Sequence, residues 1–268
     1  VNVSINENLL AAGDRVCVND KCQLVQANPV DITLNLEPGT RDLLVALKDS
    51  SGLVKVAKVA KGVNVTSGGS ASVSLESGDV TDPVSFTVPD PPQGYMAFPG
   101  AFVSYLSANG TAGGSVNASP TSYRPVSGFG SGDLYGAYIL AFSPNATLES
   151  LQVFNSGAPS LAFPAPWEGG SLTVTQTAHP TVTGLTRSDS DLQGYAISLE
   201  GPGLRYTATL SKAWLGSADS YALPDLSSQL NYTPLRSGDS ARFGVAALLS
   251  NKTTPSINFT NPSGFAAG

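Results

Sequence analysis

Short runs of alternating apolar and polar residues, separated by Gly, Pro, Asn and Ser, extend from Asn28 to Gly78. The runs begin at Ile32, Leu43, Leu53, Val63 and Ala71. In the second run, we expect Leu43, Val45 and Leu47 to share one face. Such period-2 alternation is typical of half-buried antiparallel strands, and strands that recur this closely predict two sheets packed face to face as a sandwich.

The run that starts at Leu53 permits two interpretations. Lysines recur every three residues at positions 55, 58 and 61, a spacing compatible with a short helix. The valines at positions 54, 56 and 59 are β-branched and the run is brief, which favours a strand with a bulge.

Aromatic residues are confined to the later part of the chain. All ten Phe, all nine Tyr and both Trp lie at or beyond Phe86, whereas five of the seven Lys lie before Gly62. This shift predicts two hydrophobic cores, one aliphatic and one rich in aromatic rings. The proline-rich segment 81–94 is a stiff spacer between them, so we expect domains at residues 1–83 and 84–268.

Residues 165–260 carry a further pattern. Two strands pair across a Gly-Pro-Gly turn between Gly194 and Leu210, the step Tyr-Ala-Leu-Pro-Asp-Leu spans 221–226, and a late strand lies within 237–248. The segment resembles fibronectin type III and related immunoglobulin-like modules. The segment differs from these modules at the position of their core Trp, because Gln176 lies near that position here. The resemblance implies a sandwich at 165–268 and adhesive or spacer duty, without transferring a site.

These patterns together predict an all-β fold of tandem antiparallel β-sandwich, immunoglobulin-like domains. The 14 basic and 20 acidic residues give a net charge of -6, which argues against a nucleic-acid partner. No run of about 18 apolar residues is present, so the chain is not expected to span a membrane. Only 13% of residues are charged. Such a composition is typical of secreted and surface proteins, and we expect an extracellular location.

The two cysteines lie five residues apart around Asn19-Asp20. A hairpin that turns on this pair would place Cys17 opposite Cys22, within reach of a disulfide. Two free thiols, or half of a metal site, are the alternatives.

Residues suited to catalysis are sparse. His179 is the one histidine, it lies in a loop-like Ala-His-Pro step, and no Gly-x-Ser-x-Gly motif accompanies it. Paired carboxylates would serve a glycosidase, but most candidates stand next to turns, where acids solvate strand ends. They are Glu149, Glu168, Glu200, Asp219 and Asp225. We therefore expect no enzyme and no cofactor.

The sequence contains two candidate binding sites, each with two interpretations. Asp189-Ser190-Asp191 resembles a fragment of a calcium loop but lacks the Gly and the distal Glu, so a solvated turn is the favoured interpretation. Aromatic side chains in loop-rich segments could stack on sugar rings, or could fill the core instead. These are Trp167, Trp214, Tyr221 and Tyr232.

Asn-x-Ser/Thr occurs at eight positions, more often than chance predicts, and many of them fall at expected turns. They are Asn2, Asn64, Asn109, Asn117, Asn145, Asn231, Asn251 and Asn258. Such sites accept N-linked glycans in secreted proteins. A surface rich in Ser, Thr and Asn also generates them without any function, and the sequence leaves both interpretations open.

The sequence favours a non-enzymatic, extracellular structural subunit of a cell-surface assembly, such as a filament or pilus, a surface layer or an envelope. Its partners would be other copies of itself or envelope proteins, and glycans are a further option. Val1, Val3 and Ile5 alternate with polar residues and would suit a strand donated to a neighbour's sheet edge. The alternative function is a carbohydrate-binding or adhesive accessory module.

Overall fold

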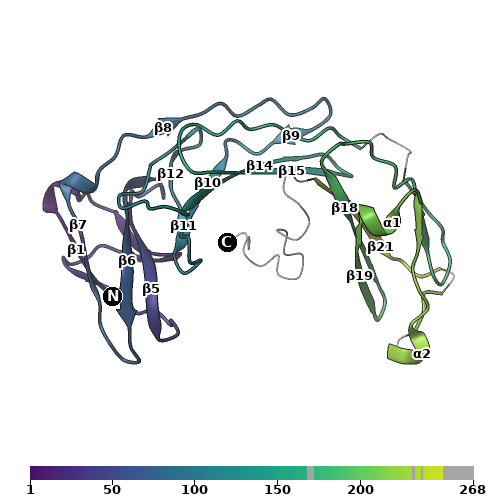
Figure 1. Ribbon diagram of the computed structural model, residues 1–268, viewed down its shortest axis with the longest axis horizontal. Helices are drawn as coiled ribbons and strands as arrows, with labels where there is room; N and C mark the ends of the chain where they lie inside the picture. Colours follow the sequence, from purple (N-terminus) through teal and green to yellow (C-terminus); the bar gives the residue numbers. More distant parts are fainter. Residues whose placement is uncertain (168–171, 231–232, 237, 250–268) are drawn as a thin grey trace. The chain divides into compact units, whose positions relative to one another are not determined.

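The computed structural model describes residues 1–167, 172–230, 233–236 and 238–249 (Figure 1). Contacts group the chain into two compact units, Val1–Pro166 and Trp167–Gly268. The expected boundary at residue 83 lies inside the first unit, because the segments before and after it share a core. In the described part of the chain, no helix is long and apolar enough to cross a membrane.

Strands dominate both units. Those of the first unit are β1 (Asn2–Ile5), β2 (Arg15–Val18), β3 (Lys21–Leu24), β4 (Val30–Asp31), β5 (Gly39–Lys48), β6 (Val54–Val65), β7 (Ser72–Leu75), β8 (Val84–Ser85), β9 (Met96–Ala97), β10 (Phe102–Leu106), β11 (Gly113–Ser115), β12 (Asn117–Ser119), β13 (Ser122–Tyr123), β14 (Leu134–Phe142) and β15 (Thr147–Phe154). Two 3₁₀ turns, η1 (Glu7–Leu9) and η2 (Ser77–Asp79), lie among them.

The second unit holds β16 (Thr173–Val174), β17 (Thr181–Thr183), β18 (Leu192–Gly201), β19 (Leu204–Ser211), β20 (Ser220–Ala222) and β21 (Arg242–Leu249). Its helices α1 (Lys212–Leu215) and α2 (Ser227–Leu230) have four residues each. The predicted all-β sandwich class is confirmed, and nearly every strand pair is antiparallel.

The first 75 residues build an aliphatic sandwich. The sheet β4-β1-β7 packs on the sheet β3-β2-β5-β6. Its buried core contains no aromatic residue, as the composition predicts. Cys17 lies opposite Cys22 in the β2–β3 hairpin and the two form a disulfide, which confirms the expected bond.

β1 is an inner strand of its sheet. It pairs antiparallel with β4 and parallel with β7. Val3 and Ile5 are buried in the aliphatic core, and the amino terminus of Val1 donates to the Ile32 carbonyl at 2.6 Å. The segment expected to serve as a donated strand is therefore occupied within its own domain, and donation would require the domain to open.

β5 is buried on both faces. Leu43, Val45 and Leu47 point into the aliphatic core as expected, while Leu44 and Ala46 point into a second core. Figure 1 shows β5 and β6 between β1 and β7 on one side and β10 and β11 on the other. The first unit thus has three layers, and its middle layer carries apolar residues in an unbroken run.

β6 joins two of the expected strands into one. It runs for 12 residues, and the register with β5 shifts at two points. The bulged strand expected after Leu53 is therefore confirmed against the helix. The run at Val63 is the end of this same strand and not a separate one.

Aromatic rings fill the second core. Tyr105, Tyr123 and Tyr135 are almost fully buried, with Phe129 and Phe154 packed against them at centroid distances of 4.8 to 6.1 Å. The Val126 amide donates to the Tyr135 hydroxyl, which satisfies that buried polar group. The sheet β11-β10-β14-β15, with β9 on β14, supplies most of this core, and β12-β13-β8 forms a smaller sheet.

The second unit pairs a β16-β17-β20 sheet with a β19-β18-β21 sheet. This is the order of the A-B-E and C′-C-F strands of an immunoglobulin-like sandwich. The core lies around Tyr195, Ile197 and Leu199. Trp167 packs on it from a position ahead of β16, with its ring 5.7 Å from that of Tyr195. A tryptophan therefore does reach this core, although not from the strand position where the family carries one.

Candidate functional site

The sheet β9-β10-β14-β15 exposes a cluster of large apolar side chains, which we call the outer face. Its members are Met96, Phe98, Phe102, Leu106, Leu134, Phe142, Leu151 and Val153, with exposed fractions between 38% and 64%. These eight are the majority of the 13 exposed large apolar residues in the described part of the chain. Most others are scattered singly, as is normal on a protein surface.

Strand register brings these side chains together. Phe102 lies opposite Tyr138, and Leu106 lies opposite Leu134. On the next strand, Leu151 is paired with Tyr138. Because side chains of paired residues point to the same side of a sheet, all of them lie away from the aromatic core. Phe98 adds its ring 4.8 Å from that of Phe102. The outer face is thus continuous across four strands.

The outer face carries little charge. Glu149 is the one charged residue among the outward positions of β10, β14 and β15. Burial and the neighbouring Glu149 carboxylate raise the pKa of Tyr138 to about 12, so its hydroxyl stays neutral.

The edge of β15 lies beside the outer face. β15 pairs with β14 alone within the described residues and contains neither Pro nor Lys, two common blocks to edge pairing. The surface is suited to bind another apolar surface.

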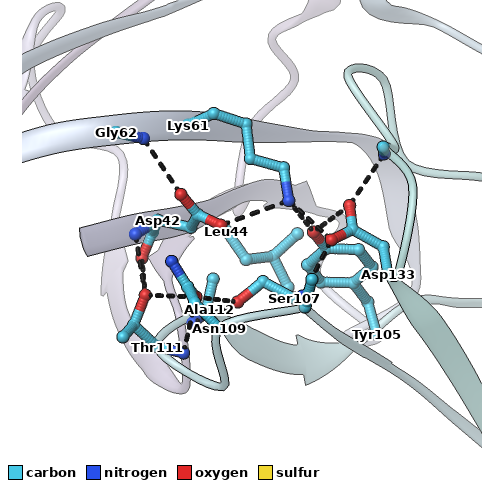
Figure 2. Close-up of polar contacts among 12 residues, drawn as sticks. Asp42, Leu44, Lys61, Gly62, Tyr105, Ser107, Asn109, Thr111, Ala112 and Asp133 are labelled. Atoms are coloured by element: carbon cyan, nitrogen blue, oxygen red, sulfur yellow. Dashed lines mark hydrogen bonds and ion pairs between the residues drawn. The ribbon is translucent and has the colours of Figure 1, made fainter. Parts of the chain in front are cut away.

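The second feature is a polar cluster that joins the middle layer of the first unit to the sheet of the aromatic core. Figure 2 shows the Lys61 ammonium reaching between Asp42 and Asp133. Its Nζ lies 2.6 Å from Asp133 Oδ1 and 3.2 Å from Asp42 Oδ2. Asp133 is fully buried, and Tyr105 donates its hydroxyl proton to Asp133 Oδ2 at 2.8 Å. We call Asp42, Lys61, Tyr105 and Asp133 the ion network.

Backbone groups complete the ion network. The amides of Ala108 and Gly130 donate to Asp133 at 2.9 and 2.8 Å, and the amide of Gly62 donates to Asp42 at 2.9 Å. Asp42 comes from β5 and Lys61 from β6, whereas Tyr105 comes from β10 and Asp133 from the turn before β14. The network therefore joins the strands on the two sides of the expected domain boundary.

The pKa shifts of Lys61 and Asp133 are opposite in direction to those that nucleophilic or acid catalysis needs. Burial disfavours the Lys61 charge, but its bonds to Asp133 and Asp42 outweigh this and raise the pKa of Lys61. Burial likewise opposes the charge on Asp133, yet the bonds from Lys61, Gly130 and Tyr105 lower its pKa. A nucleophilic amine or a general acid needs the opposite shifts. The ion network acts as a structural clamp.

The 107–112 loop provides a further link across the same boundary. The Asp42 amide donates to Thr111 Oγ1 at 2.7 Å, and the Asn19 side-chain amide donates to the Thr111 carbonyl at 3.4 Å. Asn109 accepts from the Ser107 hydroxyl and from the Thr111 amide and hydroxyl. Figure 2 shows this loop beside Asp42. Sequence reasoning identified none of these contacts, because they join residues up to 92 positions apart.

The glycan acceptor positions differ in accessibility. Asn64, Asn109 and Asn145 are exposed, and Asn2 is half-buried with its amide on Asp31. Asn117 donates to the Ala101 carbonyl and accepts from the Val103 amide, both at 2.7 Å, so its side chain already has a structural role. Asn231, Asn251 and Asn258 lie outside the described residues.

The expected catalytic and metal-binding candidates do not converge. His179 Nε2 lies 3.4 Å from Asp225, which is exposed. Asp189 is held by Arg187 through two bonds of 2.7 and 3.0 Å. Over the ranges that the structure describes, no group of three His, Cys, Asp or Glu side chains is placed to hold a metal ion. Glu168 falls outside those ranges.

The loop aromatics are divided between core and surface. Trp167 packs on the core of the second unit, under the Arg187 guanidinium at 5.7 Å. Trp214 is 68% exposed, and its ring lies 6.1 Å from that of Tyr221. Tyr232 is not among the described residues. Trp214 and Tyr221 border a groove of about 720 Å³ between β19 and β20.

Comparison with known proteins leaves the family open. No family model matches the sequence, and no curated protein matches it. Among solved structures, the chain is similar to the FN1–FN3 domains of chicken CNTN1, contactin-1, which are fibronectin type III domains. The match has 12% identity and a TM-score of 0.23, and it covers 88% of this chain and 85% of that chain. A likeness at this TM-score carries no argument about function.

Proposed function

We propose that this chain is a non-enzymatic structural subunit of an assembly at the cell exterior, such as a filament, a surface layer or an envelope, and that it joins a neighbouring copy through the outer face. The observation that carries the proposal is the gathering of eight exposed apolar side chains on one side of one sheet. Soluble monomers rarely leave a contiguous apolar patch of this kind in water, and such patches mark interaction sites.

The area of the outer face fits a stable contact. Aromatic side chains bury about 150 to 250 Å² each, and the five aliphatic side chains of the outer face lie near or below the lower limit. At the observed exposures, the eight together offer on the order of 600 Å² per copy, close to the ~800 Å² per partner of a standard-size interface. The partly exposed Tyr138 and Leu140 add to this area.

A second copy suits this surface because the face is nearly uncharged and complements itself. In a twofold contact the same patch lies on both copies, and two such sheets would pack about 10 Å apart. The edge of β15 that no other described strand pairs with borders the outer face, and a strand added there would extend the contact. The Cys17–Cys22 disulfide and the low content of charged residues support a location outside the reducing cytosol.

The test is the oligomeric state of the purified chain, measured by sedimentation over a wide concentration range. We expect reversible self-association, weakened about tenfold or more by Leu151→Asp, because a buried charge without a partner is costly at an interface. Val80→Asp is the matched control, since Val80 is 44% exposed and Leu151 is 43% exposed, and Val80 lies outside the outer face. The proposal would be contradicted if the chain stayed monomeric at millimolar concentration. It would also be contradicted if Leu151→Asp and Val80→Asp weakened self-association equally.

A further inference from the structure

The groove of the second unit lies on the open flank of its sandwich. β19 is an edge strand of one sheet and β20 is an edge strand of the other, in the order seen for the described residues. Residues of both strands line the groove, and α1 adds Trp214. The groove has a volume of about 720 Å³ and is open to solvent, so it offers a binding surface along a strand edge and not an enclosed cavity.

Trp214 is held in place although its ring is in water. The Ser211 hydroxyl caps α1 and accepts from the Trp214 amide at 3.1 Å, which fixes the backbone of that residue. The indole contacts the Tyr221 ring edge to face, at an interplanar angle of 69°. An exposed tryptophan that is fixed in this manner costs little conformational entropy when a ligand binds against it.

Tyrosines extend the aromatic wall of the groove. The hydroxyls of Tyr206 and Tyr221 lie 2.7 Å apart and share a hydrogen bond, which links β19 to β20. Tyr206 also packs on the core of the second unit. The two tyrosines of the wall are therefore anchored to both sheets.

The groove contains neutral polar groups only. Thr207 and Thr209 are exposed on the outward side of β19, and Ser211 and Gln193 also border the groove. None of its lining residues is Asp, Glu, Lys, Arg or His. A ligand with an apolar ring face and a rim of neutral hydroxyls would match both parts, because the face stacks on an aromatic ring and the rim exchanges hydrogen bonds with hydroxyl groups.

We propose that this groove binds a neutral oligosaccharide, with Trp214 as the stacking platform and the threonines of β19 as hydrogen-bond partners. The site belongs to the second unit and does not depend on the outer face. The rival occupant is an extended peptide that adds to the edge of β19 through backbone hydrogen bonds. That peptide would pair with the edge of β19 that no other described strand covers, but it would gain little from an exposed indole.

The test uses the full chain and a panel of neutral oligosaccharides, namely cellohexaose, xylohexaose, mannohexaose, maltohexaose and chitohexaose. Trp167→Phe leaves Trp214 as the remaining tryptophan of the sequence, so the emission of this variant reports on the groove alone. We expect at least one sugar to change that emission and to give a matching calorimetric isotherm. Trp214→Ala should weaken calorimetric binding about tenfold or more, while Trp214→Phe, which keeps a ring, should weaken it less.

Thr209→Val keeps the size of the side chain and removes its hydroxyl, so we expect a severalfold loss of affinity. Leu151→Asp, on the outer face, should bind sugar as the parent chain does, which separates this site from the assembly. The proposal would be overturned if no sugar in the panel changed the emission or gave a calorimetric isotherm. It would also be overturned if Trp214→Ala bound sugar as tightly as the parent chain. The same holds if a β-strand peptide binds the groove and Trp214→Ala leaves its affinity unchanged.

Discussion

At the scale of single residues, Lys61 is the charge that contacts two carboxylates of the ion network. Its side chain is 36% exposed, but its partner Asp133 is fully buried. Removal of the ammonium leaves a buried carboxylate without its counter-ion, and breaking such a pair typically costs ~3 to 5 kcal/mol. Because water reaches Lys61 itself, we expect a smaller loss for Lys61→Met, of about 2 to 3 kcal/mol in the free energy of unfolding.

Urea denaturation followed by tyrosine fluorescence would measure this loss. Arg41→Met is the matched control, because the Arg41–Glu37 pair lies at the surface with Glu37 91% exposed. A surface pair contributes at most about 1 kcal/mol. Equal destabilisation by the two variants would show that the ion network is not a clamp.

The same residues predict a dependence of stability on pH. The pKa of Asp133 is lowered in the folded chain, so its contribution is complete above the unfolded value of about 3.9 and is lost as the pH falls through the lower, folded value. The pKa of Lys61 is raised, so its contribution is complete below about 10.4 and is lost as the pH rises through the higher, folded value.

We therefore expect a plateau of stability between these limits, with losses below about pH 4 and above about pH 10. Urea midpoints measured across this range would show the plateau. In Lys61→Met the alkaline loss should shrink, because the titrating amine is absent. An unchanged alkaline limb in that variant would assign the loss to other groups.

At the scale of elements, the local sequence pattern predicts the strands and the hairpin disulfide. It does not predict which sheet faces and strand edges are covered by other strands. Alternation placed Leu43, Val45 and Leu47 on one buried face, and that prediction is confirmed. The burial of Leu44 and Ala46 depends on a third layer from residues beyond 84, which no local window reveals. The strand at Val1 to Ile5 was predicted correctly as a strand, but its neighbour β7 lies some 70 residues away.

The candidate sites show the same division. Trp214 and Tyr221 were identifiable from the sequence as loop aromatics, and they border one groove. Trp167 was equally visible, yet it fills the core. The outer face was missed because Phe102, Leu106 and Leu151 are ordinary strand residues until the register shows that no layer of the first unit covers them. Sequence reveals the kind of side chain, whereas exposure depends on pairing between distant strands.

At the scale of the whole molecule, the position of the domain boundary has a testable consequence. The composition shift predicts that residues 1–83 form a domain, but Leu44, Ala46, Ala57 and Val59 bury their side chains against residues that follow 84. A chain that ends at 83 would expose this apolar surface on β5 and β6 and would lose the partners of Lys61. We expect it to bind a hydrophobic dye and to unfold at a lower urea concentration than a chain of residues 1–166.

The comparison of these two truncated chains with the full chain identifies the folding unit. If 1–166 is the cooperative unit, it should unfold in one transition, at the urea midpoint that the same unit shows in the full chain. Leu44→Asp provides the internal check, because it should destabilise 1–166 strongly and 1–83 hardly at all, where that side chain already faces water. A fragment 1–83 as stable as 1–166, and equally insensitive to dye, would instead place the boundary at residue 83.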